Sequence, residues 1–266
     1  MSGLLLVNPR SGDGRPSADE LRAEAGRRDI RVRLLGDGDD PAGLAREADA
    51  EVLGMAGGDG SLAPVAQVAV DRGLPFVVVP FGTRNHFARD LGLDRSDPIG
   101  ALDAFTGGRE RRVDVGRVNG DAFLNNVSLG LYAELVHRRE SHRRRGEAMA
   151  RLRALLLLAR DRSTLGIRVD GQAVETHVAL VANNDYQLDL FSLGERERLD
   201  EGRLHLDIAH GVLPSTWEAR VAEHFVIDSE RGRLQAARDG EPMELETPLE
   251  FTIQPQALRV LLPPGR

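Results

Sequence analysis

The sequence contains no cysteine among its 266 residues, which excludes a disulfide framework and thiolate metal sites. It also contains no run of about 18 apolar residues, the length that is needed to cross a bilayer. The apolar run Leu4–Val7 is too short for the roughly 7–15 apolar residues of a secretory signal. The net charge of −7 argues against general binding to nucleic acid. We therefore expect a soluble, cytoplasmic protein that has no nucleic-acid partner.

The first part of the chain alternates between strand and helix signals. Ser17 is followed three residues later by Glu20, a capping-box pattern that starts a helix. Asp40 is an N-cap residue, and Pro41 after it favours the first helical position. This order predicts a mainly parallel sheet with helices on both faces. The expected strands are 4–7, 30–35, 51–56 and 75–80, and the expected helices are 17–25, 40–48 and 61–73.

The pattern changes after residue 110, where turn dipeptides separate alternating runs. Asn119-Gly120, Asp170-Gly171 and Asp239-Gly240 are the pairs that favour tight β-hairpins. Hairpins join antiparallel strands, so we expect an antiparallel second domain that begins near residue 115. Between the first two pairs, a basic cluster at 137–145 precedes an apolar segment at 146–162 that we expect to be helical.

A glycine loop follows the expected strand 51–56 and opens the next helix. Gly57, Gly58, Asp59 and Gly60 lie where α/β folds bind phosphate, because glycine lets the backbone approach the ligand. An acid beside phosphates is repulsive unless a cation lies between them, so Asp59 suggests a Mg²⁺-nucleotide. The loop lacks the lysine of the P-loop pattern and the spacing of the dinucleotide fingerprint. The alternative is a tight turn in which Asp59 is an N-cap.

A second polar loop follows the next expected strand, 75–80. It places Gly82, Thr83 and Asn85 before another helix. Two neighbouring strand ends with polar loops form the kind of crevice that binds ligands in open sheets. The alternative is an ordinary connection that is capped by Thr83.

The chain contains several motifs in this order: "NPRSG" at 8–12, "GGDGS" at 57–61, "PFGTRNHFARDLGL" at 80–93, "VDVGRVNGDAFLNNVSLG" at 113–130, "VANN" at 181–184, "RLDEGRLHLDI" at 198–208 and the stretch 238–260. Together they resemble the diacylglycerol kinase catalytic domain family, which includes bacterial lipid kinases and sphingosine kinases. The resemblance implies an N-terminal Rossmann-like α/β ATP-binding domain over 1–115. It also implies an antiparallel β-sandwich-like domain over 116–255, which contributes the lipid site and the catalytic acid, and a last strand over 256–266 that returns to the first domain.

The resemblance also implies roles for particular residues, with ATP and Mg²⁺ as cofactors. The late acids Asp239 and Glu241 supply the general base, and one of them helps to hold Mg²⁺. Glu201 matches an acid that holds a structural Mg²⁺ with backbone carbonyls near Arg198 and Arg203, and Asp59 is the second expected metal residue. We expect Asp59 and Asp239 to be polar loop residues whose loss removes activity and leaves the protein folded. The residues that match nucleotide-binding positions are Asn8, Arg10, Ser11, Gly57, Gly58, Asp59, Gly60, Ser61, Thr83 and Asn85.

Three departures from the family pattern affect the expected chemistry. His86 stands where the family usually has an acid of the Mg²⁺ network, and imidazole is a poor Mg²⁺ ligand. Ala63-Pro64 replaces the usual Asn-Glu pair. The segment 185–197 replaces a glycine-rich stretch that lies near the lipid entrance in the family, so the acceptor can differ from diacylglycerol.

These observations favour a lipid kinase that transfers the ATP γ-phosphate to the hydroxyl of a lipid such as diacylglycerol at a membrane surface. One alternative is a soluble kinase of the NAD-kinase type, although its acceptor motif is not found. The other is a protein that binds a nucleotide or lipid with little turnover. The replacement of the family's usual acid by His86 suggests this alternative. Peripheral binding at the inner membrane face and homodimer formation are left open.

Overall fold

The structure is a computed structural model that describes residues 2–12, 15–130, 164–186, 188–189, 192–193, 196–210 and 217–265. Contacts within the chain divide it into two compact units. The first unit comprises Met1–Val115 and Pro255–Arg266, and the second comprises Gly116–Gln254. The expected helix 146–162 and the basic cluster 137–145 lie outside the described residues.

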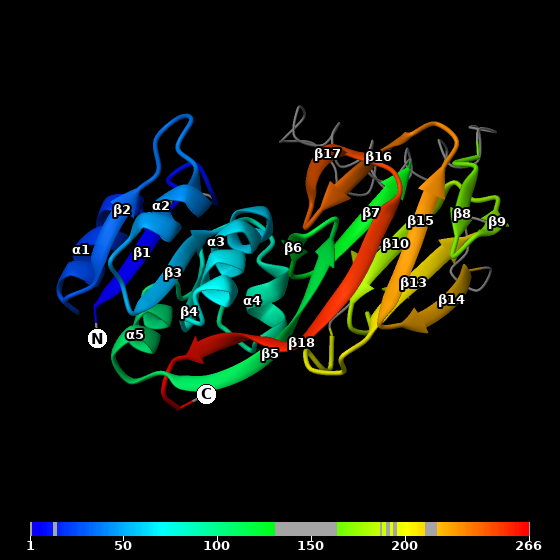
Figure 1. Ribbon diagram of the computed structural model, residues 1–266. Coiled ribbons are helices and arrows are strands. Elements are labelled where there is room, and N and C mark those ends of the chain that lie inside the picture. The colour runs from blue at the N-terminus through cyan, green and yellow to red at the C-terminus, as the bar shows by residue number, and fades with distance from the viewer. Residues whose placement is uncertain are drawn as a thin grey trace. The chain divides into compact units, whose positions relative to one another are not determined.

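The first unit is an α/β unit with a parallel sheet (Figure 1). Its strands lie in the order β2-β1-β3-β4, and each neighbouring pair is parallel. The end of β18 extends this order, because Val260 and Leu261 pair in parallel with β4. The strands are β1 (Gly3–Val7), β2 (Arg31–Leu34), β3 (Val52–Gly57), β4 (Phe76–Pro80), the first part of β5 (Arg109–Val118) and the last part of β18 (Leu249–Leu262). The helices are α1 (Ala18–Gly26), α2 (Pro41–Glu47), α3 (Asp59–Asp71), α4 (His86–Asp90), the 3₁₀ helix η1 (Gly100–Asp103) and α5 (Ala104–Gly107).

Local signals in the sequence account for the elements of this unit. Every residue of β3 and of β4 is buried, as expected for apolar strands that helices cover in a parallel sheet. The capping box of Ser17 and Glu20 is confirmed, since each side chain bonds to the backbone of the other residue. Asp40 caps α2 by accepting a hydrogen bond from the Ala42 N–H, and Pro41 occupies the first helical position.

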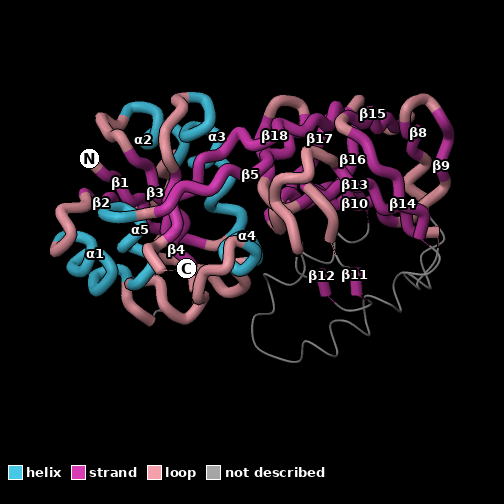
Figure 2. The backbone as a smooth tube through the Cα atoms, turned by 90° about the horizontal axis from the view of Figure 1, so that it is seen from below, coloured by secondary structure: helices cyan, strands magenta, loops and turns pink. Residues whose placement is uncertain are grey.

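The second unit consists of antiparallel strands, and Figure 2 shows helices only in the first unit among the described residues. One sheet has the order β14-β13-β10-β7-β16-β17. A second group of strands has the order β18-β15-β8-β9, and β5 pairs with both β18 and β6. The strands are β6 (Asp121–Phe123), β7 (Asn126–Gly130), β8 (Ile167–Val169), β9 (Gln172–Val174), β10 (Val178–Asn183), β11 (Leu188–Asp189), β12 (Ser192–Leu193), β13 (Leu204–Ala209), β14 (Trp217–Ala222), β15 (His224–Ser229), β16 (Arg233–Arg238) and β17 (Glu241–Glu246).

The hairpin predictions are confirmed at all three turn dipeptides. Asn119-Gly120 joins β5 to β6, Asp170-Gly171 joins β8 to β9, and Asp239-Gly240 joins β16 to β17. Both residues of each pair have positive φ, between 49° and 88°, as a type I′ turn requires. The two groups of strands share one apolar core, in which the rings of Phe123 and Phe251 meet edge to face at 6.3 Å.

The observed architecture confirms the predicted fold class, an α/β unit joined to a unit of antiparallel sheets. The expected helix 61–73 begins two residues earlier, at Asp59, and it ends at Asp71. Across the described ranges, no helix is both long enough and apolar enough to span a membrane.

Candidate active site

The first glycine loop of the α/β unit is the direct continuation of β3. The strand ends at Gly57, Gly58 is the N-cap of α3, and the helix already includes Asp59. The alternative in which Asp59 is the N-cap of this helix is therefore wrong. Gly60 and Ser61 form the first turn of α3 with Asp59, so the expected phosphate-binding residues lie at the amino end of a 13-residue helix. The Ser61 N–H donates to the Gly58 carbonyl at 2.9 Å, and backbone N–H groups at such an end favour anions.

The carboxylate of Asp59 is directed at the second loop. Its Oδ2 accepts the N–H of His86 at 3.0 Å, and its Oδ1 accepts the N–H of Phe87 at 2.9 Å. These are the first two N–H groups of α4, which have no partner within their own helix. Asp59 is buried, with 9% of its surface exposed. The expectation that Asp59 lies in a loop is therefore wrong, because the residue belongs to the first turn of α3, is buried and holds the start of the neighbouring helix.

The second loop is closed on itself by the side chain of Asn85. Its Oδ1 accepts the N–H of Gly82 at 2.9 Å, and its Nδ2 donates to the Gly82 carbonyl at 2.7 Å. Asn85 is the N-cap of α4 and adopts the left-handed conformation, with φ 51° and ψ 49°. The alternative in which Thr83 caps this helix is therefore wrong. Thr83 is exposed, so its hydroxyl is available to a ligand.

The two loops approach each other backbone to backbone. A Cβ atom at Gly82 would lie 2.4 Å from the Cα of Gly58 and 2.8 Å from its nitrogen. Contacts of that kind do not occur between real atoms, so a side chain at residue 82 would force the loops apart. The glycine at this position is therefore required by packing.

A third segment of the α/β unit adjoins the first loop. The N–H of Asn8 donates to the Ala56 carbonyl at 2.9 Å, and its Nδ2 reaches Oγ of Ser61 at 3.4 Å. Ser11 bonds back to Asn8 through a backbone hydrogen bond of 3.1 Å. Arg10 instead pairs with the exposed carboxylate of Asp37. The structure thus brings Asn8 and Ser61 together and directs Arg10 to a surface acid.

His86 is half-buried at the start of α4. Burial lowers the pKa of His86, and the positive charges of Arg89 and Arg84 act in the same direction, while Asp59 partly offsets them. Its Nδ1 is buried and has no hydrogen-bond partner in the described part of the chain. A neutral imidazole occupies the position where the sequence comparison expected an acid.

The donor set of these loops constrains how Mg²⁺ could be held. Both oxygens of Asp59 already accept backbone N–H groups, and His86 adds no carboxylate. Among the residues that the structure describes, no three His, Asp or Glu side chains form a metal cluster. Mg²⁺ in phosphoryl transfer is held by one or two carboxylates together with the substrate phosphates. The residues therefore fit a Mg²⁺ that arrives with a nucleotide, and they do not fit a resident ion in an all-protein cage.

In the β-rich unit, Asp239 is buried against a bend of the chain. Its Oδ2 accepts the N–H of Leu124 at 2.9 Å. Its Oδ1 accepts the N–H groups of Asn125 at 2.7 Å and of Asn126 at 3.1 Å. Three backbone N–H donors therefore satisfy the buried carboxylate. Asp239 is 6% exposed, so it too is an anchor rather than a free loop residue. Glu241 is exposed at the first position of β17.

Glu201 belongs to a small polar cluster on the same unit. Its Oε2 accepts the N–H of Asp185 at 3.3 Å and lies 3.1 Å from Nε2 of His205. The Arg203 carbonyl, one of the oxygens expected near a metal, accepts the N–H of Asn184 at 3.0 Å. Both of these contacts involve Oε2, so a Mg²⁺ at Glu201 would either bind through Oε1 or displace the imidazole from Oε2.

Comparisons with known proteins show the family to which this chain belongs. The family model named diacylglycerol kinase catalytic domain matches residues 2–118. A Pseudomonas fluorescens protein named probable lipid kinase YegS-like is 31% identical over 273 aligned positions, which cover 93% of this chain and 90% of that protein. The chain belongs to the diacylglycerol kinase catalytic domain family.

Other relatives of this lipid kinase family match over different lengths. The diacylglycerol kinase of Bacillus subtilis is 36% identical over 103 residues, which are 37% of this chain and 34% of that protein. The crystal structure of a diacylglycerol kinase from Bacillus anthracis superposes with a TM-score of 0.70 at 18% identity, covering 99% of this chain and 97% of that one. That likeness shows a common fold.

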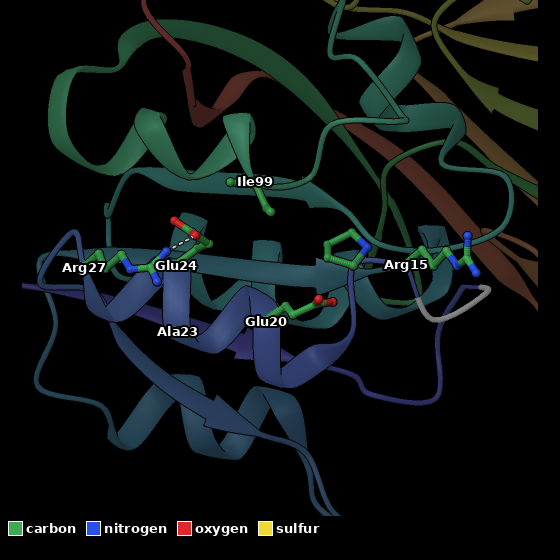
Figure 3. A pocket seen from close by; sticks show the side chains of 7 residues that line it. Arg15, Glu20, Ala23, Glu24, Arg27 and Ile99 are labelled. Carbon is green, nitrogen blue, oxygen red and sulfur yellow. Dashed lines mark hydrogen bonds and ion pairs between the residues drawn. The ribbon is translucent and has the colours of Figure 1, made fainter.

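A hollow elsewhere in the α/β unit contains none of the residues that match the family's site. It lies beside α1, where Glu24 and Arg27 form an ion pair within its lining (Figure 3). Glu20, which also lines it, belongs to the capping box of this helix. These polar side chains thus have structural roles in α1, and the family motifs point to the two glycine loops as the candidate site instead. Its lining residues are Arg15, Pro16, Glu20, Ala23, Glu24, Arg27 and Ile99.

Sequence reasoning missed a buried arginine of the β-rich unit. Arg196 is 4% exposed, and its guanidinium donates to the same bend that Asp239 holds. Its position inside the segment 185–197, which departs from the family pattern, is the only signal in the sequence, and an arginine in such a segment is usually exposed.

The contact between the loops predicts a penalty for Gly82→Ala. The added methyl group meets backbone atoms of Gly58 that have no freedom to rotate away, so the free energy of unfolding should fall by about 1–3 kcal/mol. Gly26→Ala is the matched control, because nothing lies within 4 Å of its Cβ position and its φ is not in the left-handed region. Urea unfolding of both variants measures the difference, and equal stability of the two would contradict the close approach.

A second prediction concerns Asp207 on β13. Burial raises the pKa of this half-buried carboxyl to about 6, with His205 lowering it and Asp185 raising it by smaller amounts. Between pH 4 and 6 the folded protein keeps a proton that the unfolded chain has lost, so this contribution to stability is present at low pH and is lost as the pH rises through 6. Since the side chain is partly exposed, we expect about 1 kcal/mol.

Asp207→Asn removes this titration. Urea unfolding at pH 4 and at pH 7 should show that wild type loses about 1 kcal/mol relative to the variant over that interval. A constant difference between the two proteins across the interval would show that the Asp207 carboxyl titrates normally.

Proposed function

We propose that this chain is a lipid kinase that transfers the γ-phosphate of ATP to the hydroxyl of a lipid such as diacylglycerol. The observation that carries the proposal is the pair of glycine loops at the carboxyl ends of β3 and β4. Their backbones meet at Gly58 and Gly82, and Asp59 fixes one loop to the other. Membership of a lipid kinase family supports this assignment.

The chemistry of the proposed reaction needs donors for the phosphates and an acceptor for a proton. The N-terminal N–H groups of α3, the exposed hydroxyl of Thr83 and the amide of Asn8 supply donors of the kind that cradle phosphate. Mg²⁺ that enters with ATP would neutralise charge on the β- and γ-phosphates. Of Asp239 and Glu241, Glu241 is the exposed carboxylate. One of these two residues would act as the general base, and one would help to hold Mg²⁺.

In the proposed step, the lipid hydroxyl oxygen forms a bond to the γ-phosphorus. The bond between that phosphorus and the oxygen bridging to the β-phosphate breaks, so ADP leaves with the electron pair. The hydroxyl proton passes to a carboxylate of the pair Asp239 and Glu241. The products are a phosphorylated lipid and ADP.

Transfer of label from γ-labelled ATP tests the proposal. The assay contains Mg²⁺ and mixed micelles with diacylglycerol, monoacylglycerol, ceramide, a sphingoid base or phosphatidylglycerol, and NAD is tested separately. We expect label in a lipid. Label only in NAD would identify an NAD-kinase-like enzyme, and ATP binding without any transfer would indicate a binding protein.

Glu241→Gln is the informative variant in this assay. Because Glu241 is exposed, its loss should lower kcat about 100-fold without changing the unfolding midpoint. Glu244→Gln is the matched control, since Glu244 is exposed on the same strand and bonds only to Arg233 and Gln235 among the described residues. A wild-type kcat in Glu241→Gln would show that Glu241 has no role in the mechanism.

A further inference from the structure

Arg196 is a buried cation whose contacts converge on the bend at residues 124–126. Its Nη1 donates to the Leu124 carbonyl at 2.7 Å and to the Asn183 carbonyl at 3.0 Å. Its Nη2 donates to Oδ1 of Asn125 at 2.8 Å, and the guanidinium lies 4.7 Å from the centre of the Tyr186 ring. Burying a cation costs free energy unless its hydrogen bonds are satisfied, and these contacts supply that compensation.

The peptide group between Leu124 and Asn125 lies between this arginine and Asp239. Its carbonyl accepts the guanidinium at 2.7 Å, and its N–H donates to Oδ1 of Asp239, also at 2.7 Å. Nδ2 of Asn183 donates to the same carbonyl at 3.1 Å. A positive charge at the oxygen and a negative charge at the N–H polarise the peptide in the same sense, and consecutive hydrogen bonds of this kind strengthen one another.

The side chain of Asn125 is held as well, so the bend has one arrangement. Its Oδ1 accepts hydrogen bonds from Arg196 and from the Tyr186 hydroxyl, the second at 3.2 Å. The planar fork of a guanidinium can reach two carbonyls and an amide oxygen at once, which a lysine ammonium on its flexible stem does not match. Arginine at this position is therefore explained by the geometry of the bend.

We propose that Arg196 is a positioning residue for Asp239, acting through the Leu124–Asn125 peptide. The guanidinium fixes the carbonyl end of this peptide, the peptide fixes its N–H, and the N–H fixes the orientation of the Asp239 carboxylate. The effect on turnover rests on the proposed function, in which Asp239 belongs to the catalytic acids. The effect on the bend does not.

A double-mutant cycle separates this role from general support of the fold. We expect Arg196→Gln to lower kcat about tenfold, with KM for ATP unchanged, which is the usual size of effect for a partner behind a functional group. If Arg196 acts through Asp239, adding Arg196→Gln to Asp239→Asn should cost no further activity. Arg168→Gln is the control, since Arg168 is an exposed arginine of the same unit near Glu230. Additive losses in the double variant would overturn the proposal.

Amide hydrogen exchange of the peptide containing residues 124–126 tests the positioning without substrate. Exchange should be faster in Arg196→Gln and in Asp239→Asn than in wild type, and unchanged in Arg168→Gln. Wild-type exchange in Arg196→Gln would overturn the proposal, even if the protein transferred phosphate to no lipid. If Arg196→Gln does not fold, Arg196→Lys takes its place, because it keeps the charge and loses the fork. Its exchange should lie between those of wild type and Asp239→Asn, and exchange equal to wild type would contradict the role.

Discussion

A buried aspartate that accepts backbone N–H groups from a segment distant in the sequence is the interaction that fixes the local structure in each of the two units. Asp59 holds the first turn of α4, and Asp239 holds the bend at residues 124–126. Buried N–H groups must be paired, and a buried carboxylate must be compensated. Each aspartate satisfies both requirements together, so loop and acid fix each other.

This arrangement gives Asp59, the acid of the glycine loop, a structural role. An aspartate beside phosphates suggests a metal ligand when it is considered alone. In the structure, its two oxygens are directed at backbone donors of the second loop, and the glycines at 58 and 82 allow the two backbones to meet. The acid thus shapes the surface that N–H groups and hydroxyls present to an anion.

The sequence was sufficient where the signal is local. The three turn dipeptides predicted three hairpins because residues that tolerate positive φ are rare and adjacent. The capping box of Ser17 and Glu20 was visible for the same reason, as its two members lie three residues apart. The buried strands β3 and β4 followed from their continuous apolar runs.

The sequence was insufficient where a side chain bonds to a distant backbone. Asp59 lies 27 positions before the N–H of His86, and Asp239 lies 115 positions after that of Leu124. Every residue has backbone polar groups, and the sequence does not show which of them a given side chain will bond. The anchoring roles of these acids could therefore not be predicted. The family motif identified the residues, and the fold was needed to show what they hold.

Calorimetric titration of ATP into wild type and Asp59→Asn tests the central claim most directly. The titration is performed with Mg²⁺ and again in a chelator, with Asp37→Asn as a control because that carboxylate is exposed and pairs only with Arg10 among the described residues. If Asp59 acts by holding the loops, the variant should lose the same factor in ATP affinity, about tenfold, under both conditions, as expected for removal of a buried charged hydrogen-bond acceptor. If Asp59→Asn instead binds ATP with wild-type affinity in the chelator and loses affinity only when Mg²⁺ is present, the account is contradicted. Asp59 would then act mainly as a metal ligand.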